Sequence, residues 1–310
     1  MSSKPEKAVL LLAFGGVDSE SDIEPFIKNV LKGRPVTPEM VEKARERYRL
    51  IGGRSPLLDI TNTQAKAIEE ILNSDAGARF TYRAYVGMRY WDPFIKDALA
   101  GIKKDGIGSA VAVIMAPFIS RVATGGYEAD VESALSAQGG TPEVGFTKPF
   151  HINLKFIDIL AERINRELAS FAARTDALVI FSNHSLPLSA LEGDPYEMMI
   201  RQTVEEVLKK AGKFDYKVSF QSAGSGPRQW LGPRTEDVIL EAKRAGKKGV
   251  VLVPLGFVAD HVETLYDIDI LFKTTAASVG LEFRRCPSLN TDPGFMELLA
   301  DLVKKHTERK

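Results

Sequence analysis

Six continuous apolar runs, each closed by turn or polar residues, recur along the chain. They are residues 8–16 (AVLLLAFGG), 80–88 (FTYRAYVGM), 109–120 (SAVAVIMAPFIS), 177–185 (ALVIFSNHS), 216–224 (YKVSFQSAG) and 249–257 (GVVLVPLGF). Apolar runs of this length predict parallel strands that are buried on both faces. Between them lie amphipathic segments with helical spacing, such as residues 92–106, 153–171 and 234–249. Strands that alternate with helices predict an α/β fold with right-handed crossovers.

The order of these elements repeats. A strand, an amphipathic helix and a second strand over residues 80–118 are echoed over residues 216–257, although the echo is one of pattern and not of close identity. The repeat predicts two similar α/β lobes, each with a central parallel sheet flanked by helices. Turn residues cluster at 139–151, so we place the lobes at residues 1–145 and 146–310. The helix expected over 293–307 is free to pack on the first lobe, but the pattern does not require it.

Composition narrows the class of protein. The 310 residues carry 41 basic and 41 acidic side chains, so no bulk charge attracts nucleic acid or an anionic membrane surface. A single cysteine, Cys286, cannot form an internal disulfide. No stretch approaches the roughly 20 apolar residues that span a bilayer. We therefore expect a globular protein of the reducing cytoplasm.

The segment VIFSNHSLP (179–187) ends a predicted buried strand with polar residues. Ligands of parallel α/β sheets bind beyond the carboxyl ends of strands, and His184 lies at such an end. An imidazole there is suited to act as a general base or as a metal ligand. The alternative is structural, in which Ser182, Asn183 and Ser185 cap the next segment and His184 makes an ordinary hydrogen bond.

A second segment, VPLGFVADHVETLYDIDI (253–270), also runs from a buried strand into polar residues. Asp260 followed by Glu263 fits a capping box at the start of a helix. On that helix Glu263 and Asp267 share one face at the i, i+4 spacing, where two like charges repel and a bound cation would relieve the repulsion. His261 is expected to point elsewhere. The segment GSGPRQWLGP (224–233) lacks the spacing of a nucleotide loop and is expected to form an irregular turn.

Taken together, these segments closely resemble the two signature regions of ferrochelatases, enzymes that insert ferrous iron into a porphyrin at the end of haem synthesis. The resemblance continues through RYRLIGGRSPL (47–57), GMRYWDPFI (87–95), GDPY (193–196), FQSAGSGPRQWLGP (220–233) and SLNTDPGF (288–295), and so covers nearly the whole chain. It implies two similar Rossmann-type lobes with a cleft between them. It also implies a lyase that forms nitrogen–metal bonds and releases two protons from protoporphyrin IX or coproporphyrin III.

The resemblance assigns roles to individual residues. His184 matches the metal-binding and proton-accepting histidine of the family, Glu263 matches the carboxylate that faces it, and Asp267 matches the next acidic position. Similarity further suggests that the porphyrin is lined or held by Arg47, Tyr48, Ser55 and Tyr127. A neutral imidazole and a carboxylate are ligands suited to Fe(II), which must be released into the ring.

Three positions depart from relatives. Phe14 stands where related bacterial enzymes carry a tyrosine, Leu31 replaces an arginine near the propionates, and Leu271 replaces a third acid beyond Asp267. Other expectations from the resemblance are a monomer without an iron–sulfur cluster or any permanently bound cofactor. Iron and porphyrin are its partners, and transient contact with a membrane is left open. The alternatives are a chelatase for another tetrapyrrole or metal, and a porphyrin or haem carrier without turnover.

Overall fold

The computed structural model describes residues 4–224 and 228–308, so residues 225–227 of the expected turn at 224–233 lie outside the described part. The chain divides into two compact units. The first comprises Met1–Ala116, Val122–Pro149 and Asn290–Lys310, and the second comprises Pro117–Arg121 and Phe150–Leu289. The C-terminal helix thus belongs to the first unit, and the five-residue segment Pro117–Arg121 belongs to the second.

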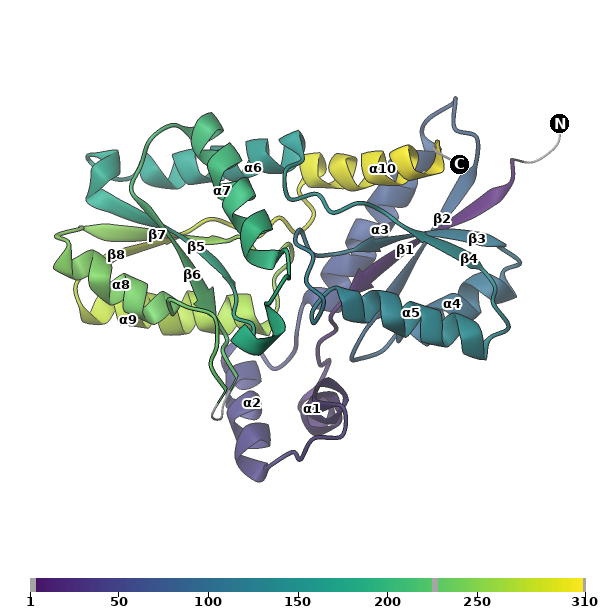
Figure 1. Ribbon diagram of the computed structural model, residues 1–310, viewed down its shortest axis with the longest axis horizontal. Coiled ribbons are helices and arrows are strands. Elements are labelled where there is room, and N and C mark those ends of the chain that lie inside the picture. Colours follow the sequence, from purple (N-terminus) through teal and green to yellow (C-terminus); the bar gives the residue numbers. More distant parts are fainter. Residues whose placement is uncertain (1–3, 225–227, 309–310) are drawn as a thin grey trace. The chain divides into compact units, whose positions relative to one another are not determined.

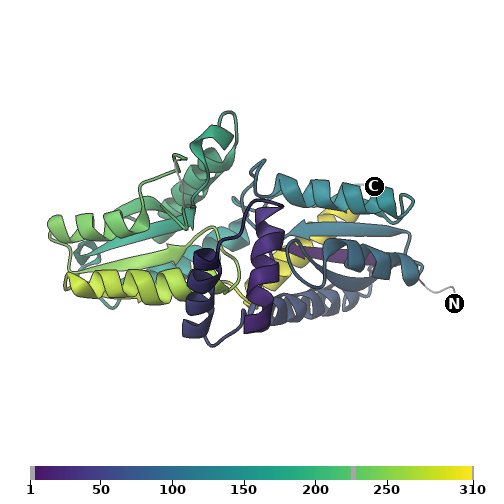
Figure 2. The same cartoon turned by 90° about the horizontal axis from the view of Figure 1, so that it is seen from below.

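The first unit contains four strands and the helices that cover them. Its strands are β1 (Glu6–Ala13), β2 (Thr81–Met88), β3 (Ser109–Ile114) and β4 (Glu143–Phe146), all parallel and in the order β2-β1-β3-β4. Its helices are η1 (Glu20–Asp22), α1 (Ile23–Leu31), α2 (Pro38–Leu50), α3 (Leu57–Asn73), α4 (Ile95–Lys104), α5 (Gly125–Ala137) and α10 (Pro293–Thr307). Helices α3 and α10 cover one face of the sheet and α4 and α5 the other (Figure 1). Helices α1 and α2, in purple, lie side by side (Figure 2).

Burial on both faces explains the apolar run that predicted β1. Alternate residues Ala8, Leu10 and Leu12 pack against α4 and α5, and Val9 and Leu11 between them point to the opposite face. All five are fully buried. A strand covered on both sides must be apolar at every position, which is why no alternation is visible in the sequence.

The second unit repeats this arrangement. Its strands β5 (Ala177–His184), β6 (Tyr216–Gln221), β7 (Gly249–Pro254) and β8 (Glu282–Arg285) are parallel and ordered β6-β5-β7-β8. Its helices are α6 (Leu154–Leu168), η2 (Arg174–Asp176), η3 (Leu188–Ala190), α7 (Tyr196–Ala211), α8 (Thr235–Arg244), η4 (Glu263–Phe272) and α9 (Lys273–Ser278). Helices α6 and α7 lie on one face and α8 and α9 on the other (Figure 1). The predicted α/β class, with two similar lobes built on parallel sheets, is confirmed.

The strand order fixes where a ligand site can form in the second unit. From β5 the chain crosses to β6 on one side, and it then returns to β7 on the other side of β5. The carboxyl ends of β5 and β7 therefore flank the point where the direction of winding changes, which is the usual ligand position in open α/β sheets. His184 is the last residue of β5, and the loop after β7 leads to Glu263.

Two strands and several helices were not predicted. Strands β4 and β8 are four-residue edge strands of mixed polarity, and β4 falls inside the turn-rich segment 139–151. Helices α1, α5 and α9 and the short helices η1, η2 and η3 were also missed. Strand β3 ends at Ile114, six residues before the predicted end, because residues 117–121 leave the first unit. In the described part of the chain, no helix is both long and apolar enough to cross a membrane.

The element that carries Glu263 is a π-helix, η4, of ten residues. Its hydrogen bonds run from each residue to the fifth along, a geometry that is rare and is frequently found at functional sites. Ile268 and Phe272 anchor it in the hydrophobic core of the second unit, against Val238 and Ile239 of α8. Leu271 packs beside this core.

Candidate functional site

The polar residues at the end of β5 have two different uses. Ser182, Asn183 and Ser185 are fully buried, and their side chains hydrogen-bond within the second unit. The Ser182 hydroxyl donates to Gln221 at 2.7 Å, and the Ser185 hydroxyl donates to the carbonyl of Leu231 at 2.8 Å. His184 differs from them, because 38% of its side chain is exposed. The serines hold the strand end in place, while the imidazole remains accessible.

Two hydrogen bonds fix the orientation of His184. Its Nδ1 lies 2.6 Å from the carbonyl oxygen of Ser185, so Nδ1 carries the proton and donates it. The hydroxyl of Tyr196 donates to the His184 carbonyl at 2.9 Å. These contacts leave Nε2 as the reactive nitrogen, and it lies 3.4 Å from Oε1 of Glu263.

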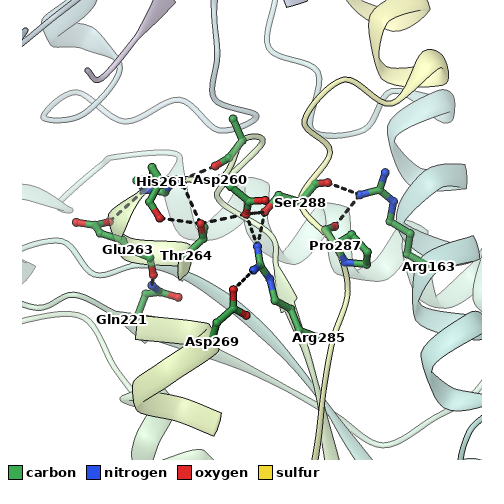
Figure 3. Close-up of polar contacts among 11 residues, drawn as sticks. Arg163, Gln221, Asp260, His261, Glu263, Thr264, Asp269, Arg285, Pro287 and Ser288 are labelled. Carbon is green, nitrogen blue, oxygen red and sulfur yellow. Dashed lines mark hydrogen bonds and ion pairs between the residues drawn. The ribbon is translucent and has the colours of Figure 1, made fainter. Parts of the chain in front are cut away.

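The backbone of Glu263 is held by a hydrogen bond, and its carboxylate faces two histidines. Nε2 of Gln221 donates to its carbonyl at 3.0 Å, and its second carboxylate oxygen lies 3.7 Å from Nε2 of His261 (Figure 3). The expectation that His261 points away was wrong, because the helix starts after His261 and helical spacing does not apply to it. The expected capping box is also absent among the described residues. The carboxylate of Glu263 turns to the histidines, and Asp260 accepts instead from the Thr264 hydroxyl at 3.1 Å.

His184 and Glu263 carry opposite charges in the protein without bound metal. Burial alone would lower the pKa of His184, but the Glu263 carboxylate outweighs burial and raises this pKa to about 9. Burial alone would likewise raise the pKa of Glu263, yet the His184 charge, their hydrogen bond and His261 hold it well below its usual range. At neutral pH His184 is therefore an imidazolium facing a carboxylate, and a metal ion must displace its Nε2 proton to bind there.

Asp267 lies on the same helix and adds to this negative field. Its side chain is 3% exposed, and Oδ2 accepts a hydrogen bond from the Ser222 hydroxyl at 2.6 Å. Asp267 also helps to raise the pKa of His184. Ser222 has a left-handed backbone with φ of 58°, which costs energy for a residue with a side chain and aims its hydroxyl at this carboxylate.

The remaining predicted residues belong to the first unit. Arg47 is exposed on α2, and Tyr48 lines a pocket of about 220 Å³ together with Arg45 and Arg49. The hydroxyl of Ser55 accepts from the amide of Leu57 at the start of α3. Tyr127 is buried in the core.

Two of the positions that depart from relatives, Phe14 and Leu31, lie in the first unit, and the structure shows what surrounds them. The Phe14 ring is 41% exposed and packs against Tyr90, with ring centres 4.6 Å apart. Lys32, which follows Leu31, pairs with Asp130 at 3.4 Å. That lysine is a single charge already shared with a carboxylate, so it does not reproduce the planar fork of an arginine.

Several residues of the site were not identified from the sequence. Gln221 ends β6 and Ser222 follows it, Tyr196 begins α7, and His261 precedes η4. A signal for Gln221 existed, because β5 and β6 are adjacent and their carboxyl ends meet at one edge, with His184 opposite Gln221 in the register. Tyr196 and His261 required the three-dimensional structure.

Comparison of the sequence with known proteins identifies the family of this chain. The ferrochelatase family model matches residues 6–307. A ferrochelatase of Geotalea uraniireducens is 40% identical over 97% of this chain and 98% of its own. A coproporphyrin III ferrochelatase of Anoxybacillus flavithermus is 35% identical over 99% of this chain and 98% of its own.

Solved structures show the same fold at low identity. The chelatase SirB of Bacillus subtilis, solved with Fe³⁺, has a TM-score of 0.59 at 12% identity and covers 97% of this chain and 95% of its own. CbiX, described as the terminal enzyme of sirohaem biosynthesis in denitrifying bacteria, has a TM-score of 0.53 at 13% identity, over 96% of this chain and 98% of its own. These likenesses concern the fold alone. With the family match over residues 6–307 and relatives of up to 40% identity along nearly their whole length, the chain belongs to the ferrochelatase family.

Proposed function

We propose that this chain inserts Fe(II) into a porphyrin in haem biosynthesis, with His184 and Glu263 as the pair that meets both iron and pyrrole protons. The observation that carries the proposal is the 3.4 Å approach of His184 Nε2 to Glu263 Oε1 at the carboxyl edge of the parallel sheet. Membership of the ferrochelatase family supplies the reaction class. Iron is a substrate here, and the reaction needs no permanently bound cofactor.

The pair suits a reaction in which protons and a cation exchange places. A free-base porphyrin must lose two N–H protons as the metal enters. In the resting protein His184 already carries a proton on Nε2, so it can accept a pyrrole proton only after iron binding has displaced the resting proton to solvent and the iron has moved into the ring. Glu263 strengthens His184 as a base in that step, because it stabilises the imidazolium that forms. Once Nε2 is deprotonated, the same two side chains offer one nitrogen and one oxygen to Fe(II), a borderline metal that accepts both. Asp267, fixed by Ser222, offers the next acidic position along η4 for metal or proton transfer.

The porphyrin is protoporphyrin IX or coproporphyrin III. The name of the Anoxybacillus flavithermus relative supports testing the second porphyrin beside the first. We propose that the exposed Arg47 pairs with a propionate in a bidentate manner. The buried side chains of Tyr48, Ser55 and Tyr127 would then shape the part of the first unit that receives the ring.

An anaerobic insertion assay with Fe(II) and each porphyrin tests the function. The wild type is compared with His184→Ala, Glu263→Gln and, as a matched control, His151→Ala, which loses a histidine that hydrogen-bonds Gln202 at 3.0 Å. Positioned acid–base groups contribute roughly 10²- to 10⁴-fold, so we expect losses in that range for the first two variants. The control should keep wild-type activity.

Full activity in His184→Ala would overturn the mechanism. A wild type that inserts iron into neither porphyrin would overturn the function itself. In that case tight porphyrin binding, measured by fluorescence quenching, would identify a carrier.

A further inference from the structure

An arginine at the end of β8 binds the segment that carries Glu263, although it is not part of the histidine–carboxylate pair. Arg285 forms ion pairs with Asp260, just before η4, and with Asp269 inside η4 (Figure 3). Its side chain is only 14% exposed. One guanidinium therefore fastens two carboxylates that lie on either side of Glu263 in the sequence.

The contacts of Asp260 extend from Arg285 to the turn before Glu263. Oδ1 of Asp260 accepts from the hydroxyls of Ser288 at 2.7 Å and Thr264 at 3.1 Å. The Thr264 hydroxyl in turn accepts from the backbone amide of His261 at 3.0 Å. These contacts thus link Arg285, through Asp260, to His261 and Thr264, which lie on either side of Glu263 in the sequence.

The arginine itself is held firmly. Its guanidinium also donates to the Ser288 hydroxyl at 2.7 Å. Arg163 of α6, which is 9% exposed, donates to the carbonyls of Pro287 at 2.6 Å and Ser288 at 2.7 Å. The segment after β8 is therefore fixed to α6, and Arg285 provides a rigid reference for η4.

The shape of the group matters as much as its charge. A guanidinium presents several N–H donors in a rigid plane and can engage two carboxylates at once, whereas a lysine ammonium is a compact charge on a flexible stem. With Arg285 in place, Asp260 and Asp269 are held at one spacing, and the π-helical turns between them keep Glu263 facing His184. Without it, two neighbouring carboxylates would repel each other, and the start of η4 could move.

We propose that Arg285 is a positioning residue for metal insertion, which holds the carboxylate of Glu263 opposite His184 by binding Asp260 and Asp269. This inference rests on the proposed function of the pair. Partners that orient a metal ligand without touching the metal typically change affinity or activity by 10- to 100-fold when they are removed. We expect an effect of that size, and we expect it to fall on iron and not on porphyrin.

The test compares Arg285→Gln and Arg285→Lys with Arg284→Gln as the matched control. Arg284 is the preceding residue of β8, is 44% exposed, and pairs only with Glu282 in the described contacts. The measurements are kcat and KM for Fe(II) and for the porphyrin, together with calorimetric titration of the porphyrin-free protein with Fe(II). Circular dichroism verifies that each variant is folded.

The expected result for Arg285→Gln is a 10- to 100-fold loss in kcat/KM for iron and a matching loss in Fe(II) affinity. Its KM for porphyrin should stay within about twofold of the wild type. Arg285→Lys should recover only part of the loss, and Arg284→Gln should match the wild type. If Arg285→Gln does not fold, Asp269→Asn serves as a milder variant, because that aspartate is 36% exposed, and it should weaken iron binding in the same direction.

The inference and the function it rests on fail in different ways. A wild type that binds porphyrin but inserts no iron would overturn the function. An active wild type whose folded Arg285→Gln or Asp269→Asn variant keeps the iron parameters of Arg284→Gln would overturn the positioning role. Equal losses for iron and porphyrin would also overturn it, since they would indicate general damage to the second unit.

Discussion

Replacing Glu263 by glutamine keeps the shape of the side chain but removes the charge that faces His184. The His184 pKa is raised from 6.5 to about 9 against the effect of burial, with Glu263 as the main cause, and each pKa unit corresponds to about 1.36 kcal/mol, so the net shift corresponds to about 3 kcal/mol. The two side chains are 38% and 26% exposed, and solvent screening reduces this figure to about 1 to 2 kcal/mol. The variant should therefore lower the His184 pKa by about 0.7 to 1.5 pKa units.

The assay is a titration of the histidine ring signals by NMR, which four histidines make easy to resolve. Thermal unfolding gives a second readout with a defined sign. Because the folded-state pKa of His184 is raised, the stabilisation is complete below about pH 6.5 and disappears as the pH rises through about 9. The variant should thus be least stable relative to the wild type near pH 6 and most similar to it above about pH 9.5.

Glu162→Gln is the control for this experiment. It removes a carboxylate of α6 that pairs with Arg166 at 2.8 Å and is 73% exposed, so it should leave the His184 titration unchanged. A His184 pKa that is the same in Glu263→Gln and in the wild type would refute the attraction between the two opposite charges. A stability difference that stays constant from pH 6 to pH 9.5 would refute it as well.

Three further outcomes are expected. Fe(II) binding should release protons at pH 7 and tighten as the pH rises toward 9, because the His184 Nε2 proton must leave; calorimetry in two buffers measures this, and a pH-independent affinity would contradict it. Tyr196→Phe leaves the partly buried carbonyl of His184 without this donor and should cost about 1 kcal/mol in denaturant unfolding, whereas Tyr216→Phe, at a 42% exposed site, should cost little. Gly249→Ala should destabilise the protein by about 1 to 3 kcal/mol, because the added methyl carbon would lie 2.7 Å from a backbone carbonyl of β8. Gly145→Ala meets only a movable histidine ring and should cost less, so equal melting temperatures for the two variants would contradict the packing argument.

Strand positions could be predicted well where burial on both faces leaves a continuous apolar run. Strands β1, β5 and β7 are of this kind, and their burial matches the sequence pattern. The edge strands β4 and β8 could not be found in this way, because a short strand at the rim of a sheet contacts fewer apolar neighbours. Helix α5 begins with two glycines, residues that have a low intrinsic preference for helix.

The site could be predicted only in part, for a similar reason. His184 stands out by its place at a strand end, but its pairing with Glu263 was inferred from the likeness of the motifs to a family and not from spacing. The segment that carries Glu263 is held by contacts in space, including those of Arg285 and Gln221. Such contacts join residues far apart in the chain, and no local pattern encodes them.

The equal strand order of the two units has a consequence for protein engineering. Strand β1 holds the same place in its sheet as β5 does in the other. His184 is the last residue of β5 and pairs with the end of β6, and Ala13 is the last residue of β1 and pairs with the end of β2. The same backbone edge thus carries an imidazole in one copy and a methyl group in the other. A designer who wished to add a second reactive centre to this scaffold would begin at Ala13, where a parallel sheet already supplies the frame and the side chains remain to be chosen.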